Sequence, residues 1–303
     1  MTEGFESASR LARPAEAVGV LDAHVHFWDP ARLHYPWLDE IRSLRRAFGP
    51  HELVAATPGV FLRGVVFVEA NCRPEESLAE AEWVSRMVAS DAEMQGIGGV
   101  RAIVAFVDLT RPERLDGALD RVAAVDRVRG ARHNIQGHGP GFCLDENFVE
   151  GVREVGRRGL TFDLCVTHDQ LADVVELARL CPETALVLDH GGKPAIRERL
   201  LDPWRRHIVE LAQFPHVVCK LSGLLTEASP TDWSEDDLWP YAEHLIEQFG
   251  PDRLIYGGDW PVVTLAGPYV EWYQFTRRLT SGWDRPQRDA FYRGNALRFY
   301  GIE

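Results

Sequence analysis

Apolar side chains along this chain gather in eight short runs separated by more polar segments. The runs, rich in Val, Ile, Leu and Phe, are 19–26, 64–71, 99–109, 128–134, 160–168, 184–192, 217–223 and 253–261. Within them apolar residues follow one another with little interruption instead of alternating strictly with polar ones. Parallel strands that are covered on both faces show this pattern. The sequence therefore predicts eight buried parallel strands.

Segments with the spacing of amphipathic helices lie between these runs. They are 75–90, 147–159, 169–181, 203–214 and 238–250. Strands and helices that alternate in this way predict an α/β fold, a TIM-type (β/α)8 barrel that fills residues 19–303 as one catalytic domain. An open doubly wound sheet would give a similar rhythm, but no G-x-G-x-x-G follows the first strand to indicate a bound nucleotide cofactor. Residues 1–18 are mostly polar and are expected to form a flexible tail.

The balance of charge narrows the range of partners. The 303 residues include 33 Lys and Arg and 46 Asp and Glu, so the formal net charge is −13. Such a charge opposes binding to nucleic acid and to anionic membrane surfaces. No stretch approaches the roughly 20 apolar residues that span a bilayer, and the N-terminus lacks the apolar core of a signal peptide. We therefore expect a small-molecule partner, with neither nucleic acid nor membrane.

The positions of the cysteines indicate the cellular compartment that we expect for this protein. The five are Cys72, Cys143, Cys165, Cys181 and Cys219, and none belongs to a C-x-x-C pair. Free, buried thiols in a reducing cytoplasm fit this scatter better than disulfides or a thiolate zinc site. The sequence thus predicts a cytoplasmic protein, and no feature of it predicts an oligomeric state.

Polar side chains stand at the ends of nearly all the predicted strands, where the active sites of such barrels form. In "LDAHVHFWDP", His24 and His26 are two residues apart on a strand and should project to the same side. An isolated H-x-H can also be a packed histidine beside an exposed one. The other strand-end candidates are Glu69, Asn71, Arg132, His133, Asn134, Asp163, His168, Asp189, His190, Lys220, Ser222 and Asp259.

Several motifs agree in order and position. They are the H-x-H of the first strand with "DAHVHFWDPARLHYPWL", "LDHGGKP" on the sixth, "CKLSGL" on the seventh, "YGGDWP" on the eighth and the closing "NALRFYGI". Together these motifs resemble the amidohydrolase superfamily, and more narrowly its lactonase branch, which includes sugar-acid lactonases and pyrone-dicarboxylate lactonases. The resemblance runs from about residue 20 to 302 and implies a distorted barrel with a hydrolytic site.

The resemblance implies that His24, His26, His190 and Asp259 form the reaction centre. Many relatives hold two metals bridged by a modified lysine on the fourth strand, but this chain has no lysine there. We therefore expect at most one divalent ion, zinc or manganese, bound by these four residues, or no metal, since members of the branch work either way. Glu69 is either a further ligand or a carboxylate that orients a ligand histidine.

Six residues are predicted to bind substrate: Glu69, Arg132, His133, Lys193, Trp28 and Trp260. All but Glu69 have a structural alternative: an ion pair for Arg132 and His133, closure of a loop for Lys193, and packing of loops for the two tryptophans. Two reaction-centre positions also leave alternatives open. Asp259 can cap the following helix, and Asp189 takes the place of His190 if the strand register differs by one residue.

Taken together, the residues predict a hydrolase that opens the ring of a small sugar-acid lactone. Asp259 would act as general base on water, and the histidines, directly or through one metal ion, would polarise the carbonyl without a covalent intermediate. A metal-dependent decarboxylase of an aromatic or unsaturated acid is the alternative on the same fold. A catalytically silent binding protein on a barrel scaffold is the alternative of another class.

Overall fold

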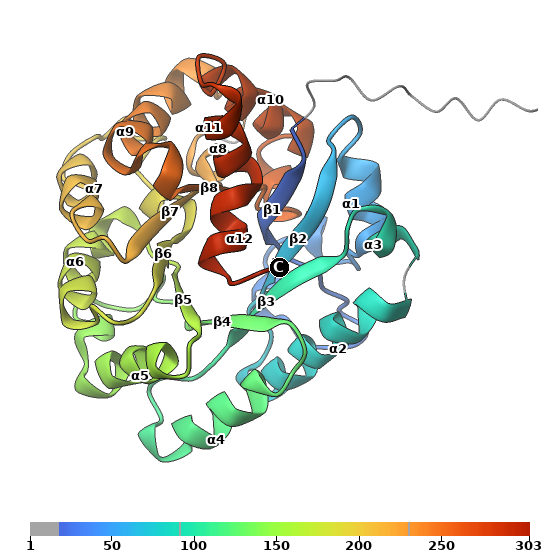
Figure 1. Cartoon of the computed structure of the whole chain (residues 1–303), viewed down its shortest axis with the longest axis vertical. Helices are drawn as coiled ribbons and strands as arrows, with labels where there is room; N and C mark the ends of the chain where they lie inside the picture. Colours follow the sequence, from blue (N-terminus) through green and yellow to red (C-terminus); the bar gives the residue numbers. More distant parts are fainter. Residues whose placement is uncertain (1–17, 91, 230) are drawn as a thin grey trace, which may run out of the picture.

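Eight parallel strands form one sheet in the order β1 to β8, and the sheet curves into a barrel surrounded by helices (Figure 1). The computed structural model describes residues 18–90, 92–229 and 231–303. The predicted tail lies outside these residues, apart from Val18. The strands are β1 Val20–Val25, β2 Leu62–Val68, β3 Val100–Phe106, β4 Val128–Arg132, β5 Thr161–Leu164, β6 Leu186–Leu188, β7 Val217–Leu221 and β8 Leu254–Tyr256. The predicted (β/α)8 barrel is confirmed.

The helices are α1 Pro50–Ala56, α2 Ser77–Ser90, α3 Ala92–Gly96, α4 Pro112–Ala123, α5 Glu146–Arg157, α6 Leu171–Leu180, α7 Trp204–Ala212, α8 Leu224–Glu227, α9 Glu235–Arg253, α10 Tyr269–Leu279, α11 Arg285–Asp289 and α12 Asn295–Phe299. All five predicted helices are present, and α4 fills the connection between β3 and β4, for which no helix was predicted. Among the described residues, no helix has both the length and the apolar character needed to cross a membrane.

Local sequence explains several helix ends. The Asp145 side chain accepts a hydrogen bond from the backbone N–H of Asn147 and so caps α5. Ser234 and Asp237 form a capping box at the start of α9, whose helical backbone breaks at Gly250, where φ is +66°. These caps fix where α5 and α9 begin.

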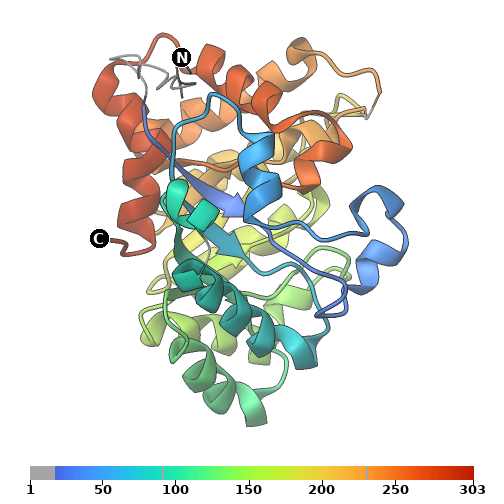
Figure 2. The same cartoon turned by 90° about the vertical axis from the view of Figure 1, so that its right-hand side faces the viewer.

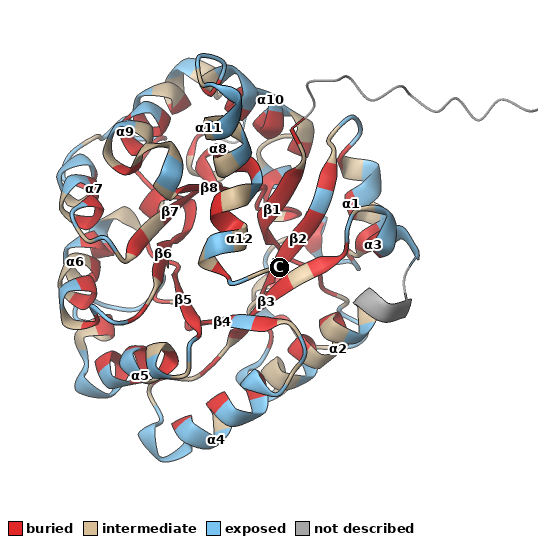
Figure 3. Ribbon diagram, in the orientation of Figure 1, coloured by how far each residue is buried: buried red, intermediate tan, exposed pale blue. Residues whose placement is uncertain are grey.

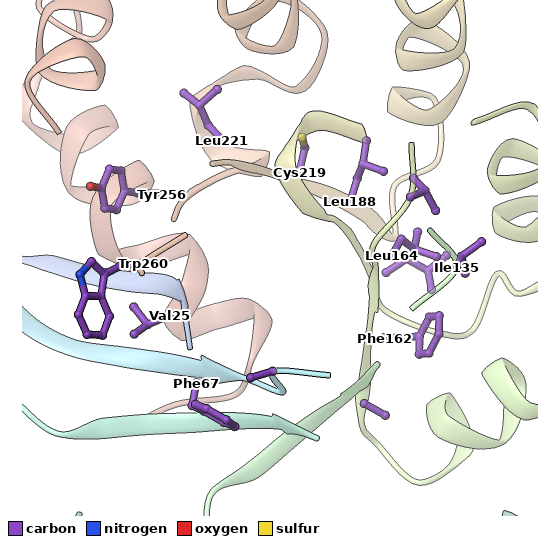
Figure 4. Packing of buried hydrophobic residues seen from close by; sticks show 14 of the residues in the cluster. Val25, Phe67, Ile135, Phe162, Leu164, Leu188, Cys219, Leu221, Tyr256 and Trp260 are labelled. Atoms are coloured by element: carbon purple, nitrogen blue, oxygen red, sulfur yellow. The ribbon is translucent and has the colours of Figure 1, made fainter. Parts of the chain in front are cut away.

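Aliphatic and aromatic side chains on the outer faces of the strands form the main core against the helices. Figure 4 shows part of this layer, with Phe67, Phe162, Leu164 and Leu188 among its labelled members. The strands are buried almost throughout, whereas the exposed residues lie on the outer sides of the helices (Figure 3). This explains the uninterrupted apolar runs in the sequence, because both faces of each strand are covered.

The barrel closes between β1 and β8, where backbone hydrogen bonds join residues just past both strands. The N–H of Asp259 donates to the carbonyl of His24 over 2.8 Å, and the N–H of His26 donates to the carbonyl of Trp260 over 2.8 Å. Beyond this end, the segment between β1 and α1 projects from the body of the barrel (Figure 2). Closure therefore fixes three of the four predicted reaction-centre residues relative to one another.

Candidate active site

His24, His26, His190 and Asp259, called the reaction centre below, meet at the carboxyl end of the barrel. The Nε2 atom of His26 lies 3.6 Å from Asp259 Oδ1. The Nε2 atoms of His24 and His190 each lie 3.9 Å from the same oxygen. The structure thus brings together the four residues that the sequence predicted, with three imidazole nitrogens directed at one carboxylate oxygen.

A left-handed backbone at the end of β6 resolves the choice between Asp189 and His190. The φ angle of His190 is +55°, so the strict alternation of a strand ends there. Asp189 and His190 therefore both reach the interior, with Asp189 Oδ1 3.3 Å from His24 Nδ1 and His190 facing Asp259. Asp259 is also left-handed, with a φ of +53°. Such conformations are costly for residues other than glycine and concentrate at functional sites.

Each imidazole is held through its Nδ1 atom, which leaves Nε2 directed into the site. His26 Nδ1 lies 2.8 Å from the carbonyl oxygen of Val68. His190 Nδ1 lies 2.9 Å from Ser222 Oγ, and His24 Nδ1 lies 3.2 Å from Lys220 Nζ. Outer partners of this kind fix the orientation of ligand or catalytic histidines.

Close packing also holds the His190 ring. Gly223 has a φ of +65°, and a Cβ atom there would lie 2.5 Å from His190 Nδ1. Only glycine therefore combines this backbone with this approach.

The electrostatic environment keeps His24 and His190 neutral and Asp259 charged at neutral pH. Burial, together with the nearby Lys220 charge, lowers the pKa of His24 well below its usual value, and burial likewise lowers the pKa of His190. Burial raises the pKa of Asp259, but His190 and His26 outweigh it, so this pKa lies below its usual value. Asp259 is therefore a carboxylate that is able to accept a proton.

The donor chemistry of the reaction centre fits a divalent metal ion. Three imidazole nitrogens and one carboxylate are typical ligands of zinc, and the ligand atoms of a tetrahedral zinc site lie about 3.3 Å apart. The three nitrogen–oxygen separations of 3.6 to 3.9 Å are slightly longer. The donor atoms of His24, His26 and Asp259 lie within 4.8 Å of one another, and those of His24, Asp189 and His190 form a second such group. His24 Nε2 is buried and has no hydrogen-bond partner among the described residues, so one nitrogen is free to face a bound group.

A chain of buried charges of alternating sign lies beneath the reaction centre, and we call it the charged row. Its members, in spatial order, are Glu69, Arg132, Asp189, Lys220 and Asp163. Arg132 Nε lies 2.6 Å from Glu69 Oε1, and its Nη1 lies 3.4 Å from Asp189 Oδ2. Lys220 Nζ lies 2.9 Å from Asp189 Oδ1 and 2.5 Å from Asp163 Oδ2. All five side chains are at most 2% exposed.

A cavity of about 300 Å³ opens above the reaction centre. Its polar wall comprises Asn71, Asn134, Gln136, Arg132 and Lys193, together with His26, His190 and Asp259 from the reaction centre. Ile41, Val262 and Leu265 form an apolar edge, and Lys193 Nζ donates to Gln136 Oε1 over 2.5 Å. A cavity of this size suits a small molecule with both polar and apolar edges.

Two predicted substrate-binding residues do not reach this cavity, and we correct them. Trp28 is fully buried, and its Nε1–H donates to the carbonyls of Leu44 and Arg46 within the segment after β1. Trp260 is 1% exposed and packs edge-on against Phe48. The structural alternative therefore holds for both, and Trp37 is the tryptophan that lines the cavity.

The four other predicted substrate-binding residues differ in how they relate to the cavity. His133 lines a neighbouring hollow, and its Nδ1 accepts a hydrogen bond from the N–H of Leu109. Glu69 lies behind the wall as the partner of Arg132. Arg132 lines part of the cavity, but its guanidinium is paired with the carboxylates of Glu69 and Asp189. Lys193 also lines the cavity. The side-chain contacts of Arg132 are thus mainly those of the ion-pair alternative.

Sequence reasoning left Gln136 unnoticed, because it stands in a loop past β4 with no motif around it. Lys220 was predicted only as a polar strand-end residue, and Asp189 only as such a residue and as the alternative to His190. A signal for Lys220 existed: it is the one charged residue in the otherwise apolar run "VVCKL". A buried lysine in such a run requires a carboxylate partner from a neighbouring strand.

Comparison with known proteins agrees with this geometry. The family model described as amidohydrolase matches residues 21–302. An L-fucono-1,5-lactonase of Burkholderia multivorans is 32% identical over 300 residues, which cover 93% of this chain and 96% of that protein. An L-rhamnono-gamma-lactonase of Scheffersomyces stipitis is 26% identical and covers 93% of this chain and 98% of its own length.

A solved structure gives the same picture in three dimensions. The crystal structure of an amidohydrolase from Burkholderia multivorans with bound zinc superposes with a TM-score of 0.82 at 32% identity. The superposition covers 94% of this chain and 99% of that one. With the family model spanning nearly the whole described barrel, this chain belongs to the amidohydrolase family.

Proposed function

We propose that this protein hydrolyses a small, neutral sugar-acid lactone. The observation that carries the proposal is the convergence of three imidazoles on Asp259, at the floor of a small cavity with hydrogen-bonding walls. Relatives named as L-fucono-1,5-lactonase and L-rhamnono-gamma-lactonase support the ester bond of the lactone ring as the bond that is broken.

Asp259 and His26 are suited to hold the attacking water. The Nδ1–H of His26 donates to the Val68 carbonyl, so the Nε2 atom is the acceptor when the ring carries one proton. Two acceptors 3.6 Å apart, His26 Nε2 and Asp259 Oδ1, can each take one O–H of the same water molecule. The water then presents a lone pair to the lactone carbonyl carbon.

The reaction needs only proton transfers between these groups and the substrate. As the water oxygen bonds to the carbonyl carbon, Asp259 accepts its proton, and the carbonyl oxygen becomes an oxyanion that His24 and His190 face. The ring C–O bond then breaks, and the proton passes from Asp259 to the leaving alkoxide. The product is the open-chain hydroxy acid, so one water is consumed for each ring opened.

A divalent ion in the reaction centre, held by its three histidines and Asp259, would supply Lewis-acid polarisation of the carbonyl and lower the pKa of a bound water. We propose zinc or manganese for this position because of the imidazole and carboxylate donors. The residues that orient the substrate do so whether or not the ion is present.

Charge pairing in the cavity wall favours a neutral substrate over a dicarboxylate. Glu69 and Asp189 already occupy the Arg132 guanidinium, and Arg132 is only 2% exposed. Lys193 is then the one cavity cation that no carboxylate pairs with among the described residues. Asn71, Asn134 and Gln136 offer amide groups that match hydroxyls.

Titration of released acid at constant pH tests the proposal. Aldono-1,4- and aldono-1,5-lactones should be hydrolysed, whereas a pyrone dicarboxylate should react far more slowly, and aromatic acids should release no CO₂. CO₂ release would indicate the decarboxylase instead. An absence of turnover across the panel, with chelator and with added zinc, would favour a binding protein.

Replacing the base gives the sharpest measurement. Asp259→Asn keeps the size of the side chain but cannot accept the proton, so kcat should fall by about 10² to 10⁴ fold. Tm should change little, since polar groups held for catalysis contribute little to stability. A kcat close to that of the wild type on the best lactone would remove Asp259 from the mechanism.

A further inference from the structure

Lys220 is surrounded by as many acceptors as it has protons to donate. It is fully buried on β7, and its Nζ lies 2.5 Å from Asp163 Oδ2, 2.9 Å from Asp189 Oδ1 and 3.2 Å from His24 Nδ1. An ammonium group has three N–H donors and no acceptor. The contact with His24 Nδ1 is a hydrogen bond, and because an ammonium group can only donate, Nδ1 accepts it.

A donor at Nδ1 decides where His24 carries its own proton. A neutral imidazole has one N–H and one lone pair, so a ring that accepts at Nδ1 is protonated at Nε2. Asp189 Oδ1, 3.3 Å from Nδ1, competes as an acceptor for the opposite tautomer. Asp189 Oδ1 has no hydrogen-bond partner among the described residues, so its contact with His24 Nδ1 is not a hydrogen bond, whereas the contact between Lys220 Nζ and His24 Nδ1 is one. Lys220 is therefore the hydrogen-bond partner of His24 Nδ1.

The neighbouring histidine has the opposite arrangement. His26 Nδ1 faces a backbone carbonyl, which only accepts, so His26 is protonated at Nδ1 and accepts at Nε2. The two histidines of the H-x-H motif thus differ in their outer partners, an ammonium for one and a carbonyl for the other. One Nε2 can donate to a substrate oxygen and the other can accept from water.

We propose that Lys220 is a positioning residue that holds His24 as an Nε2–H donor toward the lactone carbonyl and thereby weakens metal binding at that nitrogen. The part that concerns the carbonyl rests on the proposed function. A metal ion needs the Nε2 lone pair, so its binding requires the His24 proton to move to Nδ1 and the Lys220 hydrogen bond to break.

Histidine ¹⁵N chemical shifts of the metal-free protein test the proposal without any substrate. The signal of His24, assigned through its loss in His24→Asn, should show a protonated Nε2 and an unprotonated Nδ1, and His26 should show the reverse. The opposite tautomer at His24 would overturn the proposal. Because no lactone is present, this outcome is independent of whether the protein hydrolyses one.

Removing the Lys220 ammonium group should move the His24 proton from Nε2 to Nδ1. In Lys220→Met, Nδ1 can donate to Asp189, so the His24 shifts should change to the Nδ1–H form. Zinc affinity, measured by competition with a chelator, should tighten by roughly 10 to 100 fold, the scale on which outer partners tune metal sites. Unchanged or weaker zinc binding would contradict the proposal.

A matched variant separates this effect from damage to the charged row. Tyr300 donates to Asp163 from the far side of Lys220 and does not contact His24. Tyr300→Phe should therefore leave both the His24 tautomer and the zinc affinity unchanged. Lys220→Arg, which retains N–H donors, should keep the wild-type tautomer. If Lys220→Met fails to fold, Lys220→Met with Asp163→Asn removes one anion along with the cation and is measured in its place.

Discussion

The two sides of the barrel interior are filled in contrasting ways. Strands β8, β1, β2 and β3 contribute Leu21, Ala23, Val66, Val68, Ala102, Val104 and Ile255, which pack with Ala296 and Tyr300. We call these residues the apolar side. Strands β4, β5 and β7 contribute Arg132, Asp163 and Lys220 at the corresponding inward positions, and Asp189 follows β6. The terminal segment joins the two, because Tyr300 packs on the apolar side and donates to Asp163.

The contrast shows that the two sides of the barrel interior contribute differently to the fold and to the site. The apolar side contributes burial, which tolerates small changes of shape. The charged row fixes the orientation of its side chains, because each buried carboxylate in it has a cation 2.5 to 2.9 Å away. Buried charges are costly unless they are paired, so the row retains its geometry, and with it the orientation of His24, only as a complete set.

The largest effect should come from placing a charge on the apolar side. Val104 is fully buried on β3, and Val104→Asp would place a carboxylate among the apolar side chains of this cluster. We expect a loss of about 5 kcal/mol or more, enough to prevent folding. Val104→Ala, which only removes two methyl groups, should remain folded with a loss of about 2 kcal/mol. Recovery of soluble, cooperatively unfolding Val104→Asp would show that this side does not exclude charge.

Removing the Arg132 cation from the charged row should lower the free energy of unfolding somewhat less than Val104→Asp does. Arg132→Met leaves Glu69 buried without its partner, and we expect the free energy of unfolding in urea to fall by about 3 to 5 kcal/mol. The double variant Arg132→Met/Glu69→Gln should recover much of that loss, because it removes the unpaired charge. A single variant of wild-type stability with a raised KM would instead assign Arg132 to the substrate.

A buried carboxylate outside both regions sharpens the comparison. Glu80 on α2 is 1% exposed, accepts from the N–H of Ala70 and forms no ion pair among the described residues. Burial, reinforced by the nearby Glu69 charge, raises its pKa to about 8. Without a facing cation, this carboxyl group is therefore protonated at neutral pH.

The raised pKa of Glu80 fixes the sign of a pH effect. Between its ordinary pKa of 4.5 and about 8, the folded state retains a proton that the unfolded state has lost, so wild-type stability falls as pH rises through this range. In Glu80→Gln this loss is absent, and the variant should gain about 3 kcal/mol relative to the wild type between pH 5 and pH 8. Urea unfolding at both values measures the gain, and parallel pH profiles would show that Glu80 is ionised in the fold.

The sequence by itself determined the eight strands and the end of the barrel at which the site stands. Strands covered on both faces must be continuously apolar, so their positions are readable from local composition. His24, His26, His190 and Asp259 were also readable, because each stands at or just beyond the end of such a run, inside a motif. These features depend on residues that are close together in the sequence.

Partners and facing directions required the tertiary structure. Lys220 meets His24 across 196 positions of sequence, and Arg132 meets Glu69 across 63, contacts that exist only once the barrel has closed. A strand pattern cannot foresee that a left-handed residue directs Asp189 and His190 into the same interior. Nor does it show that the Trp28 ring turns to donate to loop carbonyls instead of facing the substrate. Local sequence fixes where a side chain starts, but the closure of the barrel decides what it touches.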